Sequence, residues 1–161
     1  MDEAEQTRPR ARISASAPRR GFGYVVLFGL GALLLYLSVV SLSGALGRVA
    51  LLAGGVGAIW FAETMRRATG VELILTETAL IESSGRVLAN LDEVVSVERG
   101  ALALKPSNGF TLVLQSRQPR AWAPGMWWRL GRRVGVGGVT SAGAAKFMAE
   151  QIAFQIAARN P

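Results

Sequence analysis

The feature that most constrains this chain is a long segment, residues 21–47, that carries no charged residue. Its most apolar part, residues 24–42, reads YVVLFGLGALLLYLSVVSL. At about 1.5 Å per residue, a helix of that length crosses a hydrocarbon layer of about 30 Å. The sequence therefore predicts a first transmembrane helix in this segment.

A second apolar run, residues 49–62 with the sequence VALLAGGVGAIWFA, follows almost at once. It reaches spanning length if its helix starts near Ala45 and ends near Met65, with Arg48 extending toward the membrane surface. We therefore expect residues 21–70 to form a two-helix transmembrane hairpin. A cleaved signal peptide is the alternative, but the first apolar segment exceeds the usual length of about 7–15 residues and a second segment follows it.

Arginines on the two flanks set the expected orientation. Arg66 and Arg67 follow the second run, Arg48 alone lies between the runs, and five arginines precede the first: Arg8, Arg10, Arg12, Arg19 and Arg20. Because arginine-rich flanks stay in the cytoplasm, we expect an integral membrane protein with both termini in the cytoplasm. Residues 1–20 also contain two prolines and few large apolar side chains, which predicts a disordered basic arm.

Composition excludes most enzyme mechanisms. Half of the residues are hydrophobic and the net charge is +7, which is typical of a membrane protein with a basic polar part. His and Cys are absent, and their absence removes imidazole acid–base chemistry, thiol nucleophiles, disulfides and the usual zinc ligands. Among the carboxylates, Asp92 and Glu93 are neighbours whose side chains point to opposite faces of a strand. We expect no catalytic residue, no cofactor and no metal site.

The patterning changes near Gly70, and residues 71–161 are expected to form a separate domain of short strands and one helix. Asn108-Gly109 predicts a hairpin turn, and two prolines predict a loop over residues 118–125. A helix capped by Thr140 or Ser141 should reach about Ala158, with one buried face formed by Ala145, Met148, Ala149, Ile152 and Ile156. The expected strands are residues 71–76, 79–83, 87–90, 94–99, 101–105, 110–115 and 127–136.

Three segments of this domain resemble the bacterial pleckstrin-homology-like domains found on small inner-membrane proteins. They are LILTETALIESSGRVLANLDEVVSVERG (residues 73–100), FTLVLQSR (110–117) and RRVGVGGVTSAGAAKFMAEQIA (132–153). The resemblance implies a membrane α-helical hairpin followed by a cytoplasmic α+β domain, a bent β-barrel of about seven strands capped by a C-terminal helix. It also implies a binding or scaffolding module rather than an enzyme. Eukaryotic relatives bind phosphoinositides with a basic loop near the domain start, whereas the first hairpin here carries Glu77 and Glu82 with only Arg86.

A basic and aromatic stretch without any acidic residue covers positions 117–133. Arginine pairs with lipid phosphates and tryptophan settles at the headgroup level, so this composition suits a bilayer surface. A partner protein is a second interpretation, and a purely structural role in the fold is a third; nucleic acid is not expected at a membrane-tethered site. The residues concerned are Arg117, Arg120, Trp122, Trp127, Trp128, Arg129, Arg132 and Arg133.

The second apolar run carries small residues at every fourth position, namely Ala50, Gly54, Ala58 and Ala62. Such a stripe lets another helix approach closely, and the user is either the first helix of the hairpin or another chain. Near the end of this run, Glu63 precedes Arg66 and Arg67 by three and four positions, a spacing that predicts a helical ion pair.

Together these features predict an inner-membrane protein whose cytoplasmic domain binds another membrane protein or the membrane lipids. The alternative is an accessory or assembly subunit whose helices pack into a larger membrane complex.

Overall fold

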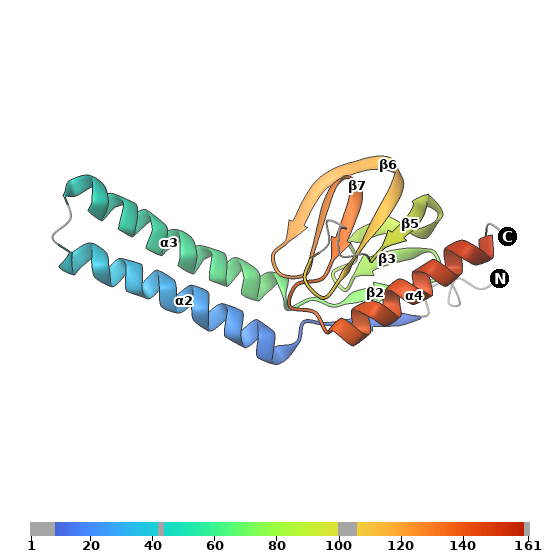
Figure 1. Cartoon of the computed structure of the whole chain (residues 1–161), viewed down its shortest axis with the longest axis horizontal. Coiled ribbons are helices and arrows are strands. Elements are labelled where there is room, and N and C mark those ends of the chain that lie inside the picture. The colour runs from blue at the N-terminus through green and yellow to red at the C-terminus, as the bar shows by residue number, and fades with distance from the viewer. Residues whose placement is uncertain (1–8, 42–43, 100–105, 160–161) are drawn as a thin grey trace. The chain divides into compact units, whose positions relative to one another are not determined.

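The computed structural model describes residues 9–41, 44–99 and 106–159 (Figure 1). The chain divides into two compact units. One is helical and covers Ala17–Arg67, and the other is β-rich and combines Met1–Ser16 with Ala68–Pro161. The β-rich unit is therefore built from chain segments on both sides of the helical unit.

The helical unit contains α2 (Ala17–Val40) and α3 (Ala45–Ala68), both long and apolar enough to cross a membrane. Pro18 lies in the first turn of α2, where its missing N–H costs no helical hydrogen bond. Many large apolar side chains point outward along both helices, including Phe22, Val25, Leu33, Tyr36, Val39, Leu46, Val49, Val56 and Trp60. A surface of this kind is what contact with hydrocarbon requires. The two helices begin and end within a few residues of the limits that the sequence predicts.

The helices α2 and α3 approach each other closely at two glycines. A Cβ atom added to Gly31 would lie 2.9 Å from the carbonyl oxygen of Gly55, and one added to Gly55 would lie 3.0 Å from that of Gly31. Both positions therefore require glycine, because any larger residue would push the two backbones apart. Ser38 and Thr64 return their hydroxyl hydrogens to carbonyl oxygens of their own helices, so neither leaves an unpaired donor in an apolar surrounding.

The β-rich unit contains two antiparallel sheets and a C-terminal helix, α4 (Ala142–Arg159). The first sheet has the order β1-β2-β3-β4, and the second, which follows the short 3-10 helix η1 (Leu91–Glu93), has the order β5-β6-β7. Over the described residues the two sheets do not close into a single barrel. The strands are β1 (Ala11–Ile13), β2 (Leu73–Leu75), β3 (Ala79–Glu82), β4 (Val87–Asn90), β5 (Val94–Glu98), β6 (Phe110–Ala123) and β7 (Trp127–Val136).

The strand β1 corrects the expectation of a disordered arm over residues 1–20. It pairs antiparallel with β2, with Ile13 opposite Leu73 and Ala11 opposite Leu75. Two arginines, Arg12 in β1 and Arg10 just before it, lie near acidic residues around the first hairpin: Arg10 is 2.6 Å from Glu77 and Arg12 is 3.9 Å from Glu72. The predicted domain boundary at residue 71 is therefore wrong, because the domain also needs residues 11–13. Residues 1–8 of the arm lie outside the described residues.

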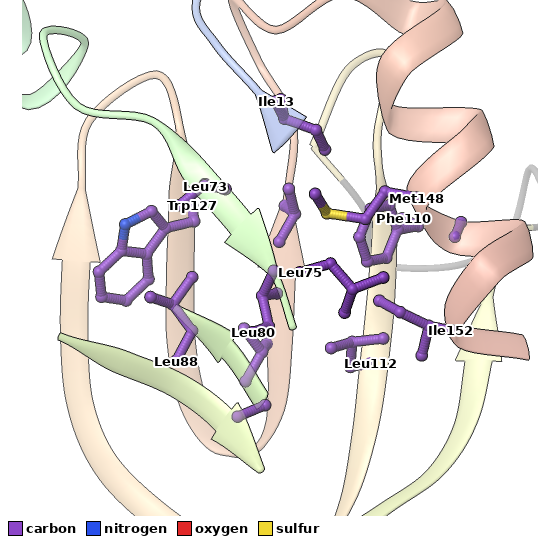
Figure 2. Close-up of a cluster of buried hydrophobic side chains, with 14 of the residues drawn as sticks. Ile13, Leu73, Leu75, Leu80, Leu88, Phe110, Leu112, Trp127, Met148 and Ile152 are labelled. Carbon is purple, nitrogen blue, oxygen red and sulfur yellow. The ribbon is translucent and has the colours of Figure 1, made fainter. Parts of the chain in front are cut away.

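One hydrophobic core joins the two sheets and α4 (Figure 2). Ile13 is fully buried and shares this core with Phe110 and Met148, which come from β6 and α4. The helix face expected from the sequence is confirmed. Ala145, Met148, Ala149 and Ile152 are buried, and Ile156 is partly buried against them.

The strand β6 is longer and more bent than the sequence predicts. Residues 118–123 were expected in a loop, but they continue β6 because Gln118, Ala121, Trp122 and Ala123 pair with β7. The register shifts twice, around Gln118, and such bulges bend a strand. Glu93 supports the bend by accepting hydrogen bonds from Ser116 (3.0 Å) and Gln118 (2.8 Å), and Gly131 opposite Gln118 has a φ of 58°. Pro119 does not end β6, because it lies where the pairing of β6 with β7 is irregular, and strands tolerate proline at such positions.

Most other local expectations are confirmed. Strands form near residues 71–76, 79–83, 87–90, 94–99 and 127–136, and α4 begins directly after Ser141. Asn108 adopts the left-handed conformation that the Asn-Gly pattern predicts, with a φ of 56°. The strand expected at residues 101–105 lies outside the described residues.

We expect Ile13→Ala to destabilise the β-rich unit by about 2–5 kcal/mol, because it removes a fully buried side chain from the core. Denaturant unfolding of the detergent-solubilised chain, followed by tryptophan fluorescence, measures the change. Arg12→Ala on the same strand is the control and should cost at most about 1 kcal/mol, since its ion pair is exposed. Equal effects of the two substitutions would contradict the assignment of β1 to the core.

The second expectation concerns Gly55. Gly55→Leu should separate α2 and α3, whereas Gly57→Leu should not, because no atom lies within 4 Å of a Cβ added at Gly57. Since the chain has no cysteine, spin labels at Leu33→Cys and Val56→Cys report the distance between the helices. We expect a lengthening on the order of 2 Å for Gly55→Leu, within the range over which helix separations depend on contact side chains. An unchanged distance would contradict the close glycine contact.

Candidate interaction surface on β6 and β7

The arginines and tryptophans of positions 117–133 lie on the paired strands β6 and β7. Arg117, Arg120 and Trp122 belong to β6, and the other five belong to β7. Trp122 is the cross-strand partner of Trp128, and Ala121 is the partner of Arg129. The structure thus brings these residues onto one hairpin but gives them different roles.

Trp127 belongs to the core and not to the surface. It is only 1% exposed, and its Nε1 donates to the Glu82 carboxylate across 3.4 Å. The guanidinium of Arg86 lies over the Trp127 ring, 5.8 Å from its centre, an arrangement that favours attraction between the cation and the ring. The expected surface contact by Trp127 is therefore wrong, because its position on β7 points inward.

Arg129 ties parts of the β-rich unit together. Its Nε donates to the Pro119 carbonyl across 2.9 Å, and its Nη1 donates to the carbonyls of Val87 (3.1 Å) and Leu88 (3.3 Å). These acceptors lie on β6 and β4, so Arg129 connects the second sheet to the edge of the first. The planar guanidinium with its five donors suits such a role. We correct the expectation for Arg129 from a surface contact to a structural one.

Arg133 is partly exposed and lies 3.0 Å from the Glu98 carboxylate of β5. This ion pair compensates its charge locally, so Arg133 adds little to an anion-attracting surface.

Three arginines of the stretch remain exposed: Arg117, Arg120 and Arg132. Among the described residues, no ion pair or hydrogen bond engages their guanidinium groups. Beside them, Trp122 is 56% exposed, and Trp128 is half-buried against Gly135. Of the eight residues that the sequence singled out, three arginines and two tryptophans are therefore available at the surface.

Leu130 is a surface residue that the sequence analysis missed. It is 53% exposed and lies two positions from Trp128 on β7. A hollow of about 480 Å³ is lined by Arg120, Ala121, Trp122, Trp128, Arg129 and Leu130. The alternation of β7 was the available signal, because Trp128 and Leu130 share one face of the strand. We call this hollow with the exposed Arg117 and Arg132 the Arg/Trp hollow.

Chemically, the Arg/Trp hollow combines apolar walls with cations and contains no carboxylate. The side chains of Arg120, Trp122 and Leu130 suit an amphiphilic anion. In the described part of the chain, no group of three or more acidic residues is placed to hold a metal ion.

The small-residue stripe of α3 is only partly used inside the hairpin. Ala62 is buried and Ala58 is half-buried, whereas Ala50 and Gly54 are exposed. The close contact with α2 is made by Gly55 instead, one position away from the stripe. A repeat of four residues turns by about 40° per step around a helix with 3.6 residues per turn, so a strict four-residue stripe drifts away from a straight neighbour.

The ion pair at the end of α3 is confirmed. Glu63 lies 2.7 Å from Arg66 and 2.7 Å from Arg67. The carboxylate is therefore compensated within its own helix, and it has the plain structural role that the spacing predicts.

Comparison of the chain with protein-family models, with curated proteins and with solved structures finds no match.

We expect Arg129→Gln to lower the free energy of unfolding of the β-rich unit by about 1–3 kcal/mol, because three carbonyl oxygens lose a donor. Arg132→Gln on the same strand is the matched control and should change it by less than about 0.5 kcal/mol, since Arg132 is exposed. Denaturation midpoints from tryptophan fluorescence distinguish the two. If Arg132→Gln proved the more damaging variant, the structural role of Arg129 would be refuted.

Proposed function

We propose that this chain is an integral protein of the bacterial inner membrane whose β-rich domain is a cytoplasmic binding module for a membrane protein or the bilayer surface. The observation that carries the proposal is the pairing of β1 with β2. These strands lie on opposite sides of the two apolar helices in the sequence, yet they belong to one sheet.

The strand pairing constrains the topology. If α2 and α3 cross a membrane, the chain must leave and return on the same side, since one folded unit contains both flanks. Residues 14–16 connect β1 to α2, and residues 69–72 connect α3 to β2, so two short connections join the two units. Arg19, Arg20, Arg66 and Arg67 on these flanks favour the cytoplasmic side.

A pleckstrin-homology-like fold is the finer interpretation that we propose for the domain. Seven strands in two antiparallel sheets, with a terminal helix packed on their common core, support it over the described residues. Here the first strand precedes the membrane hairpin instead of following it. A chain with neither His nor Cys favours binding over catalysis.

A second candidate function is that of an accessory or assembly subunit in a larger membrane complex. Ala50 and Gly54 support it, because both are exposed on α3, and a Cβ atom added at Gly54 would meet α2 only at the Leu34 side chain. Affinity purification in mild detergent distinguishes the two functions. A co-purifying complex of fixed stoichiometry favours the subunit, and recovery of the chain alone favours the independent binding module.

Reporter fusions test the shared topology. A reporter that is active only outside the cytoplasm should be silent after residue 161 and active between Gly44 and Gly47, because the arginine-rich flanks stay inside. Fusion expression is checked by immunoblotting. An active reporter at the C-terminus would contradict the proposed orientation.

A further inference from the structure

We propose that the Arg/Trp hollow docks on anionic phospholipids of the bilayer that anchors the chain. This inference rests on the proposed function, and it assigns to the domain a lipid surface as its binding partner.

The apolar part of the hollow suits the membrane interface. Trp122 and Leu130 are 56% and 53% exposed, although large apolar side chains are normally buried. They come from the two strands of one hairpin, and Trp128 lies between them as the cross-strand partner of Trp122. Indole rings are enriched at the headgroup level of membranes, where one edge is apolar and the other is wet.

The positive charge of the exposed arginines favours lipids with negatively charged headgroups. Arg120 lines the hollow, the exposed Arg117 and Arg132 lie further along the same two strands, and positions 117–133 contain no acidic residue. Glu93 contacts this part of β6, but its carboxylate accepts hydrogen bonds from Ser116 and Gln118. Guanidinium groups bind phosphate oxygens, so the net positive charge favours phosphatidylglycerol-type headgroups over zwitterionic ones.

Within the β-rich unit, backbone hydrogen bonds link the turn between β6 and β7 to the residue that precedes α2. The turn after Trp122 includes Gly125, whose carbonyl accepts a hydrogen bond from Val139 (2.9 Å). Val139 in turn accepts one from Ser16 (2.8 Å), the last residue before α2. The hairpin end that carries Trp122 and Trp128 is therefore linked by backbone hydrogen bonds to the exit toward α2. This continuity favours a lipid surface over a partner protein as the occupant.

The test uses the full chain in lipid nanodiscs, which leave both membrane faces open to solution. Because the chain has no cysteine, one spin label is attached at Leu130→Cys, and a control label at Val95→Cys on β5. The native side chains at these positions are matched in exposure, at 53% and 52%. Collisions with oxygen and with a water-soluble nickel complex report whether each label lies in lipid or in water.

We expect the label at residue 130 to enter lipid in nanodiscs that contain phosphatidylglycerol, and to remain in water when phosphatidylcholine is the sole lipid. The label at residue 95 should stay in water in both. Raising the salt to about 1 M, where the Debye length is about 3 Å, should return the first label to water.

Removing charge should have the same effect as adding salt. The triple variant Arg117→Gln, Arg120→Gln, Arg132→Gln should reduce the ratio of lipid-bound to free domain by about a hundredfold, at about fivefold per cation. The matched control, Arg99→Gln, Lys146→Gln, Arg159→Gln, removes the same charge from β5, α4 and their surroundings and should leave the ratio nearly unchanged.

Two outcomes would overturn the proposal. One is a label at residue 130 that behaves alike in anionic and zwitterionic nanodiscs; the other is protection that appears only when a protein partner is added. Neither outcome changes the orientation that the reporter fusions measure. If the fusions give the expected topology and the label does not enter lipid, the lipid site is refuted but the proposed function is not.

Discussion

The pairing of β1 with β2 is the contact on which the rest of this structure depends. It joins chain segments on either side of the two apolar helices, so the helical unit is an insertion within the β-rich domain rather than a leader in front of it. Ile13 then completes the core, and Arg10 and Arg12 compensate the acidic side chains of the first hairpin. A helical pair inserted in this way has two connections to its domain, which restrict the domain more than a single tether does.

The bend of β6 decides which residues of the basic and aromatic stretch face solvent. Glu93 holds Ser116 and Gln118 at the bulge, and the strand then returns alongside β7. As a result, neighbouring residues differ in burial: Trp127 is buried in the core, whereas Trp128 lines a hollow at the surface. The arginines differ in the same way. Arg129 donates hydrogen bonds to backbone carbonyls, whereas Arg132 is exposed to solvent or a ligand.

The sequence predicted secondary-structure elements well where neighbouring residues alone determine them. The uncharged run, the Asn-Gly turn and the spacing of Met148 and Ile152 each reflect a preference of neighbouring residues, and each appears in the structure. Prediction failed where distant residues decided the outcome. β1 has too few apolar residues to be recognised before its partner β2 is known. Pro119 and Pro124 suggested a loop over residues 118–125 because the pairing with β7 was not visible.

The sequence by itself determined that the chain has two helices of membrane-spanning length, a basic charge balance and no His or Cys chemistry, because these follow from composition and from runs of adjacent residues. It also singled out the arginines and tryptophans of positions 117–133 by their composition, although it expected a loop over residues 118–125. Only the tertiary structure decided that Trp127 is core and that Arg129 and Arg133 are engaged. It also decided that Gly55 lies against the backbone of the facing helix, whereas Gly54 lies only near its Leu34 side chain. The physical reason is that burial and pairing depend on which segments fold against each other, and a strand or helix that bends or drifts by one position exposes a different side chain.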